Sequence, residues 1–359
     1  MKYAIETFGL TKIYKKFIAV NDLEMKIPNH SIFGMLGPNG AGKTTTIKML
    51  TCLAQPTYGT AKVGGYDIKE NPNEVRETLG MVPQHVSLYK DLTVKENAEL
   101  CSDFYGVPSD ERDDRINDLM ELVDIKYAEN KRINQLSGGQ KQKASLVASL
   151  VHRPDILFLD EPTIGLDPTT KRILWDLIED LNDSGHTIIL CSHDMHEVDM
   201  LCDNVGIINT GNLVAYDTPR GLKDSLLNEQ RAEFESISST LGQIQEESNL
   251  TNEVESDSEK ALRIEREKLF HYRDMSVLVI NVNDDIINAI SEIPYVHDIN
   301  VSDKRIELKI DRFENDSVTD VLDAMIKEGA IIRSVSTQEP SLEDVFIRTT
   351  SKVKDAPRA

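Results

Sequence analysis

Residues 37–44 read Gly37-Pro38-Asn39-Gly40-Ala41-Gly42-Lys43-Thr44, and this segment says more about the architecture than any other part of the chain. It satisfies the pattern G-x-x-x-x-G-K-[ST] of a phosphate-binding loop. The apolar run before it, residues 31–36, predicts a strand, and residues 44–53 predict the helix that follows. A strand, a glycine-rich turn and a helix in this order are the context in which the pattern indicates a phosphate site.

The glycines of this loop let backbone N–H groups curl around phosphate oxygens, an approach that Cβ atoms would crowd. We expect Lys43 to reach the β- and γ-phosphates and the Thr44 hydroxyl to coordinate Mg²⁺. The alternative is an ordinary glycine-rich turn without a ligand, which the full match in the right context disfavours. The nucleotide-binding positions predicted here are Gly37, Pro38, Asn39, Gly40, Ala41, Gly42, Lys43, Thr44 and Thr45.

Two acids follow a second apolar run. Residues 156–159 predict a buried strand that ends at Asp160 and Glu161. Such a strand places its carboxylates at the carboxyl edge of the sheet, where open α/β sheets bind ligands. Asp160 therefore suits Mg²⁺, and Glu161 suits a general base for an attacking water. Alone, an Asp-Glu pair after a strand more often begins a helix, so this assignment depends on the phosphate-binding loop.

Composition limits the class of protein. The chain has 359 residues and a formal net charge of -21, and a nucleic-acid binder needs a basic face instead. We therefore expect no nucleic-acid partner. No apolar run approaches the roughly 20 residues that cross a bilayer, and the start lacks the apolar core of a signal peptide, which predicts a cytoplasmic chain. The four cysteines show no paired spacing and predict buried free thiols.

The order of the patterns predicts three segments. Residues 1–225 alternate strand-like and helical runs, as an α/β domain does. Residues 226–275 predict a linker that is acidic and polar up to residue 260. We expect it to be partly disordered, with transient helix as the alternative, and the mixed-charge stretch at 261–269 predicts a short helix. Residues 276–359 predict a small α+β domain, whose β-α-β-β-α-β order is a split-βαβ arrangement.

A further motif, Leu136-Ser137-Gly138-Gly139-Gln140, lies between the phosphate-binding loop and the Asp-Glu strand. Here Ser137 suits a helix N-cap, and the two glycines permit backbone N–H groups to approach an anion. A helix cap without a ligand is the alternative for this motif taken alone. With LSGGQ in this place, the chain resembles the nucleotide-binding subunits of ABC transporters. The resemblance implies that Ser137, Gly138, Gly139 and Gln140 bind the ATP held by the opposite subunit of a head-to-tail dimer.

The remaining family positions follow in order. The resemblance implies that Tyr14 stacks on the adenine, and that Gln84 contacts Mg²⁺ and the water and signals to the membrane subunit. It also implies that the loop ending in Asp167 crosses the dimer interface, and that His193 contacts the γ-phosphate. On this basis the catalytic residues are Glu161, His193, Lys43 and Gln84, and the metal ligands are Thr44, Gln84 and Asp160.

Residues 32–38 and 157–168, with the ending at residues 338–347, are similar to the daunorubicin-resistance-type branch of exporters. The branch does not fix the cargo, and it favours export over import. The acidic segment from Leu226 to Lys260 is longer than this branch leads us to expect.

The resemblance implies an ABC-type P-loop NTPase, with a mixed sheet core and a helical subdomain, followed by the small α+β domain. It implies an ATPase that binds ATP and Mg²⁺, works as a dimer, most simply of two identical copies, and lies at the cytoplasmic face of the cell membrane on transmembrane permease subunits. One alternative is a soluble ABC ATPase in DNA repair or translation, whose coiled coils or paired ATPase units are not found here. A second is an ATP sensor without turnover, which Glu161 and His193 argue against.

Overall fold

The computed structural model describes residues 2–251, 272–312, 317–337 and 339–352. The chain divides into two compact units. The first comprises Met1–Leu222 together with Leu342–Ala359, and the second comprises Lys223–Ser341. The last segment of the chain thus returns to the unit that contains the phosphate-binding loop.

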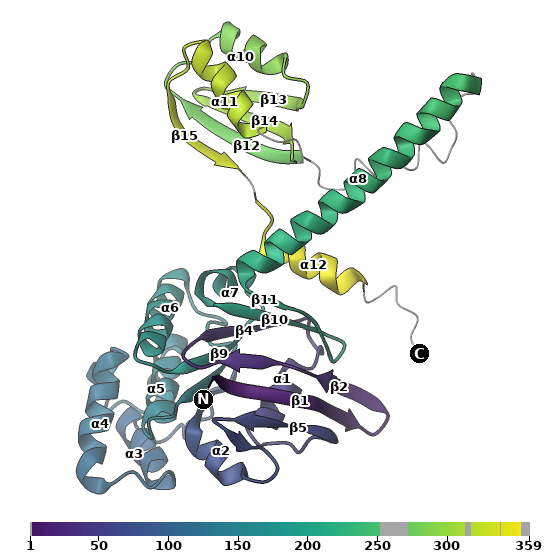
Figure 1. Cartoon of the computed structure of the whole chain (residues 1–359). Helices are drawn as coiled ribbons and strands as arrows, with labels where there is room; N and C mark the ends of the chain where they lie inside the picture. Colours follow the sequence, from purple (N-terminus) through teal and green to yellow (C-terminus); the bar gives the residue numbers. More distant parts are fainter. Residues whose placement is uncertain (1, 252–271, 313–316, 338, 353–359) are drawn as a thin grey trace. The chain divides into compact units, whose positions relative to one another are not determined.

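A six-stranded sheet forms the centre of the first unit (Figure 1), and its order is β11-β10-β4-β9-β8-β7. Neighbours from β10 to β7 run parallel, and β11 closes the edge as an antiparallel hairpin with β10. Strands β4, β8 and β9 are buried at every residue, which explains their largely apolar sequences. The bounds are β4 Ile32–Leu36, β7 Leu79–Val82, β8 Ile156–Asp160, β9 Thr187–Cys191, β10 Asn204–Asn209 and β11 Asn212–Asp217.

A second, antiparallel sheet belongs to the same unit, in the order β2-β1-β5-β6, with β3 also paired to β1. The helix α1, Lys43–Leu50, contributes Ile47, Met49 and Leu50 to a core that includes residues of both sheets. This core fixes α1, and with it the loop that precedes it. The strands are β1 Tyr3–Tyr14, β2 Phe17–Leu23, β3 Lys26–Pro28, β5 Tyr58–Val63 and β6 Tyr66–Asp67.

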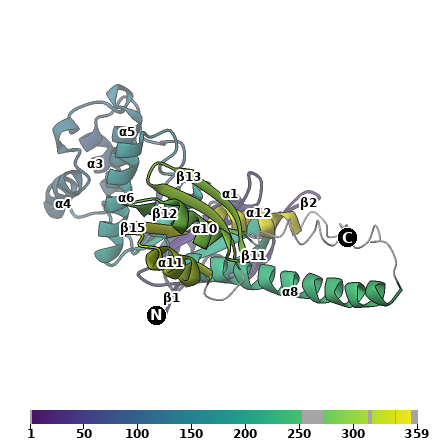
Figure 2. The ribbon, with the colours of Figure 1, turned by 90° about the horizontal axis from the view of Figure 1, so that it is seen from above.

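Three helices, α3, α4 and α5, contact one another and form a helical group, visible in Figures 1 and 2. This group corresponds to the predicted helical subdomain. The helices α6 and α7 pack on the central strands β9 and β4. The bounds are α2 Pro72–Thr78, α3 Val94–Phe104, α4 Ser109–Leu122, α5 Gly138–Leu150, α6 Pro168–Asp183, α7 Met195–Leu201 and α12 Leu342–Lys352, with short 3-10 turns at Lys126–Ala128 and Ile133–Gln135.

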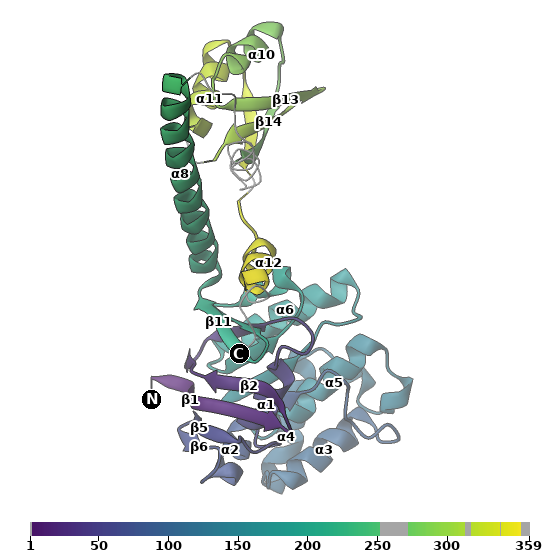
Figure 3. The same ribbon diagram turned by 90° about the vertical axis from the view of Figure 1, so that its right-hand side faces the viewer.

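The second unit contains an antiparallel sheet in the order β13-β14-β12-β15, and α10 and α11 pack on one face of it (Figure 3). Alternate residues of β14 are buried, as a strand with one covered face requires. The element order is the predicted β-α-β-β-α-β. The bounds are β12 Tyr272–Val279, α10 Asp284–Ser291, β13 Val296–Ser302, β14 Arg305–Asp311, α11 Ser317–Lys327 and β15 Ile332–Thr337.

The structure differs from the sequence interpretation over the acidic segment, where a helix, α8, runs through Pro219–Thr251. Leu222, Leu226 and Gln230 are buried at helical spacing, and Arg231 pairs with Glu235 one turn on at 3.1 Å. The acidic composition masked this periodicity. The predicted helix at residues 261–269 lies outside the described residues, and the boundaries at residues 225 and 275 stay predictions.

Candidate active site

The predicted chemical groups follow four neighbouring parallel strands. The phosphate-binding loop follows β4, Gln84 follows β7, Glu161 follows β8, and His193 follows β9. Because β4, β9, β8 and β7 are adjacent and parallel, their carboxyl ends lie at one edge of the sheet. Residues far apart in the sequence therefore converge there.

The phosphate-binding loop adopts backbone angles that require glycine. Gly40 and Gly42 have φ of 80° and 114°. A Cβ atom on Gly42 would lie 2.5 Å from the carbonyl oxygen of Ala19. Lys43 is buried at the start of α1, and its ammonium donates a hydrogen bond to the Gly37 carbonyl at 2.5 Å. The loop thus has the geometry of a cradle for phosphate oxygens, with a cation at its base.

A cavity of about 290 Å³ opens over this loop. The cavity lies between the end of β1 in the antiparallel sheet and the carboxyl edge of the parallel sheet. Its aromatic wall includes Tyr14, which is 45 % exposed and available to stack on a base. The other lining residues are Phe17, Ala19, Pro38, Asn39, Gly40, Ala41, Gly42, Lys43, Thr44, Thr45, Gln84, Asp160 and Glu161.

Glu161 and His193 meet directly. The Nδ1 atom of His193 lies 2.5 Å from Oε2 of Glu161. Glu161 has a φ of 54°, a left-handed angle that costs a residue other than glycine about 1–3 kcal/mol and that clusters at functional sites. Its N–H donates to the carbonyl of Cys191 on β9 at 2.8 Å, which fixes this turn to the neighbouring strand. The carboxylate is therefore held beside the loop in one orientation.

Asp160 has a different environment. Burial raises the pKa of its carboxyl, Glu161 raises it further, and the ammonium groups of Lys43 and Lys48 oppose the shift. A bound cation would replace the missing solvation. Asp160, Thr44 and Gln84 line the same cavity and offer carboxylate, hydroxyl and amide oxygens, which are the donors that Mg²⁺ prefers. The residues present fit a magnesium ion together with phosphate oxygens.

Sequence reasoning missed Glu197, which is fully buried on α7. Its carboxylate accepts hydrogen bonds from the hydroxyls of Ser192 at 2.5 Å and Thr163 at 3.2 Å, and from the Trp175 indole at 2.9 Å. Thr163 follows Glu161, and Ser192 precedes His193. Glu197 thus ties together the two loops that carry the catalytic pair. No pattern signals this role, because its partners come from distant segments.

The LSGGQ residues lie outside both cavities of the catalytic edge. Ser137 caps α5 in a capping box, in which its hydroxyl accepts from the Gln140 N–H and Gln140 Oε1 accepts from the Ser137 N–H at 2.9 Å. Asp167 caps α6 without a capping box, and its carboxylate accepts hydrogen bonds from the N–H groups of Thr169 and Thr170, each at 3.1 Å. The hydroxyl and N–H groups of Thr170 lower the pKa of the Asp167 carboxyl. The structure does not bring Ser137, Gly138, Gly139, Gln140 or Asp167 to this chain's own loop.

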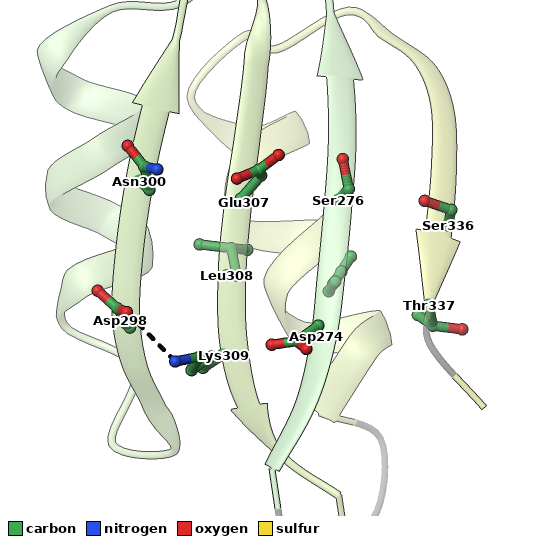
Figure 4. Close-up of a pocket in the computed structure, with 10 residues that line it drawn as sticks. Asp274, Ser276, Asp298, Asn300, Glu307, Leu308, Lys309, Ser336 and Thr337 are labelled. Atoms are coloured by element: carbon green, nitrogen blue, oxygen red, sulfur yellow. Dashed lines mark ion pairs between the residues drawn. The ribbon is translucent and has the colours of Figure 1, made fainter. Parts of the chain in front are cut away.

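A larger hollow, of about 540 Å³, lies on the open face of the sheet in the second unit (Figure 4). Most of its lining residues are polar, and Asp298 of β13 pairs with Lys309 of β14 at 3.8 Å. Asp274 and Glu307 give the face an acidic character. A polyphosphate would meet repulsion there, so we assign nucleotide to the smaller cavity over the phosphate-binding loop.

The cradle, the acids and the histidine at adjacent strand ends define a P-loop nucleotide hydrolase. The ABC transporter family model matches residues 20–164, and the model of the C-terminal domain of DrrA1-3-like ATP-binding proteins matches residues 271–350.

Individual ATP-binding proteins are also similar to this chain. The linearmycin resistance ATP-binding protein LnrL of Bacillus subtilis is 28% identical over 97% of this chain and 98% of its own length. The daunorubicin/doxorubicin resistance ATP-binding protein DrrA of Streptomyces peucetius is 38% identical over 62% of this chain and 68% of its own length. A solved ATP-binding subunit of an ABC transporter aligns with a TM-score of 0.58 and 26% identity over 62% of this chain and 92% of its own.

The chain belongs to the ATP-binding proteins of ABC transporters, in the branch with a DrrA-like C-terminal domain. It is therefore an ATP-binding and ATP-hydrolysing transporter subunit, and the predicted fold and family are confirmed. The repair and translation alternative is not supported. A post-hydrolysis cassette dimer with ADP and Pi aligns with a TM-score of 0.56 and 25% identity over 60% of this chain and 98% of its own, which agrees with dimer formation in the family.

Proposed function

We propose that ATP binds in the cavity over residues 37–45, with its base on Tyr14 and its phosphates on the loop and Lys43. The observation that carries the proposal is the contact of His193 with Glu161, whose side chain lines this cavity. Glu161 accepts a proton from the attacking water, and His193 holds that carboxylate and contacts the γ-phosphate. Lys43 stabilises charge on the departing phosphoryl group, since such reactions depend on positioning and electrostatics.

Thr44, Gln84 and Asp160 would hold Mg²⁺, which when bound neutralises the β- and γ-phosphate oxygens. The burial of Asp160 supports this role. Burial raises the pKa of its carboxyl, and a nearby cation would stabilise the ionised form. Gln84 is exposed at the end of β7, where it can contact both the nucleotide and a partner.

We propose a head-to-tail dimer of two identical copies. Ser137 and Gly138 are exposed at the N-terminus of α5, and Asp167 is exposed at that of α6. These positions are free to meet the nucleotide of a second copy, because they do not face this chain's own loop. The dipole of α5 favours an anion at its N-terminus, where Ser137 and Gly138 are exposed.

The membrane partner would contact the chain near Gln84. The following loop exposes Tyr89, and Asn97 fixes this loop by bonding the Tyr89 N–H at 2.8 Å and carbonyl at 3.1 Å. Leu88 and Leu92 lie on the same loop. We propose that these side chains receive a short helix of the transmembrane subunit.

No helix of the described residues combines enough length and apolarity to cross a bilayer. We propose that the chain is held at the cytoplasmic face of the membrane by its partners. The relatives named for linearmycin and daunorubicin/doxorubicin resistance support export of a drug, a lipid or another hydrophobic or ionic cargo as its task.

Glu161→Gln tests the proposed base. The amide keeps the size of the side chain but accepts no proton, so ATP affinity should persist and turnover should fall by about 10²-fold or more. Glu179→Gln, an exposed change on α6, is the matched control and should behave as wild type. Normal turnover in Glu161→Gln would rule out the assignment, whereas lost ATP binding would show that Glu161 serves the fold instead.

A further inference from the structure

The last described helix, α12, is part of the catalytic unit. It contacts α7, which follows His193, and β11. Leu342 and Val345 are 1 % and 4 % exposed, and the Thr350 carbonyl accepts a hydrogen bond from Asn209 of β10 at 3.2 Å. Figures 1 and 3 show α12 beside these elements. The helix is therefore anchored at both ends of its length.

The buried face of α12 continues beyond these anchors. Leu342, Val345, Phe346 and Thr349 recur at helical spacing and are buried or half-buried. Ile347 leaves this stripe and is 58 % exposed. Phe346 is thus directed inward by the same periodicity that docks the helix.

Phe346 lines a cavity of about 340 Å³ on the γ-phosphate side of the site. Gln84, Glu161 and His193 line the same cavity, and Pro38 and Asn39 of the phosphate-binding loop form part of its wall. The C-terminal segment of the chain thereby adds an apolar ring to the space that contains the reacting groups.

His193 needs support on this side. Its side chain is 62 % exposed, and the hydrogen bond to Glu161 fixes Nδ1 but leaves the ring able to swing about that contact. An apolar wall limits this motion and restricts where water stands near Glu161. Misplacement of about 1 Å costs up to about 10²-fold in rate, so such a wall has a measurable effect.

We propose that Phe346 is a positioning residue for ATP hydrolysis, which narrows the cavity around Glu161 and His193. This inference rests on the site roles proposed above. It assigns to the C-terminal segment a direct effect on turnover, at a position 185 residues beyond Glu161 in the sequence (346 minus 161).

Steady-state ATPase kinetics of the full chain test this. Phe346→Ala should lower kcat about tenfold and leave KM for ATP within about twofold, because Tyr14 and the phosphate-binding loop are untouched. Phe346→Leu keeps an apolar wall and should restore kcat to within about threefold of wild type. Ile347→Ala, the exposed neighbour on the same helix, is the matched control and should change neither value.

Two results would overturn the inference. One is a Phe346→Ala variant whose kcat equals that of Ile347→Ala. The other is a parallel loss of kcat, ATP affinity and Tm that Phe346→Leu does not reverse, which would indicate a docking residue alone. Glu161→Gln is measured alongside, so that a failure of the Phe346 inference can be told apart from a failure of the site assignment. Normal turnover in Glu161→Gln would refute the proposed roles of Glu161 and His193, whatever the result for Phe346.

Discussion

Gly42 and Glu161 both have positive φ, of 114° and 54°, and both line the cavity proposed for the nucleotide. For Gly42 the angle is free of strain, and the missing Cβ makes room for the Ala19 carbonyl. For Glu161 the angle costs conformational free energy, and the hydrogen bond from its N–H to Cys191 of β9 holds the residue in this conformation. The two residues show how the same backbone region serves binding in one place and orientation of a reacting group in another.

Gly42→Ala should abolish tight nucleotide binding. The new Cβ would lie 2.5 Å from a backbone oxygen, so the loop must shift, and affinity should fall by about tenfold or more. Gly106→Ala is the control, since Gly106 also has a positive φ, of 65°, but open space around it. Titration with a fluorescent ATP analogue measures both. Equal affinities in the two variants would contradict the role of the loop.

The buried Glu197 makes the free energy of unfolding depend on pH, and a variant at this position isolates that contribution. Burial raises the pKa of this carboxyl, so the folded protein keeps its proton over a range in which the unfolded chain has lost it. The stability that this group contributes is present below the unfolded pKa of about 4.3 and is lost as pH rises through the folded pKa.

Glu197→Gln removes this ionisable group at nearly constant size. The unfolding free energy of wild type, relative to the variant, should therefore fall as pH rises above the unfolded pKa of about 4.3, until the folded carboxyl has also lost its proton. Denaturant titrations at several pH values measure it. A difference that does not change with pH would show that Glu197 is not the buried acid of the structure.

At the scale of elements, the sequence predicts a helix or strand most accurately where one or both of its faces are buried. The strand β8 matches its predicted residues because every position is buried. The acidic run was interpreted as a partly disordered linker with transient helix, whereas the structure describes the helix α8 through Thr251, because composition outweighed a short apolar stripe. The roles of Glu197 and Phe346 depend on packing between distant segments, and one sequence carries no local signal for that.

The helix α5 has a capping box that can be compared with the one on α3. Ser137→Ala and Thr93→Ala each remove an N-cap hydroxyl and should each cost about 1 kcal/mol of stability. Turnover should fall in Ser137→Ala alone, because we propose that this helix N-terminus faces the nucleotide of a second copy. Thermal melts and ATPase assays on both variants test this, and equal turnover would count against that placement.

At the scale of the whole molecule, we propose that one chain holds two half-sites, one at the phosphate-binding loop and one at the LSGGQ helix. The cavity over the phosphate-binding loop contains the groups that bind and activate, and the LSGGQ helix lies apart from it. A solved relative is a dimer with ADP and Pi, and the family acts through such dimers. In our proposal, ATP completes its site when two copies close head to tail, and its hydrolysis releases them to drive the transmembrane subunits.

Analytical size exclusion of Glu161→Gln with Mg²⁺ and ATP tests this central claim most directly. We predict a species of about twice the 40.4 kDa chain mass that returns to monomer when ATP is removed. Adding Ser137→Arg should leave ATP binding intact and abolish the dimer, because the large cation would obstruct the second half-site. A Glu161→Gln chain that binds ATP and remains monomeric would contradict the account.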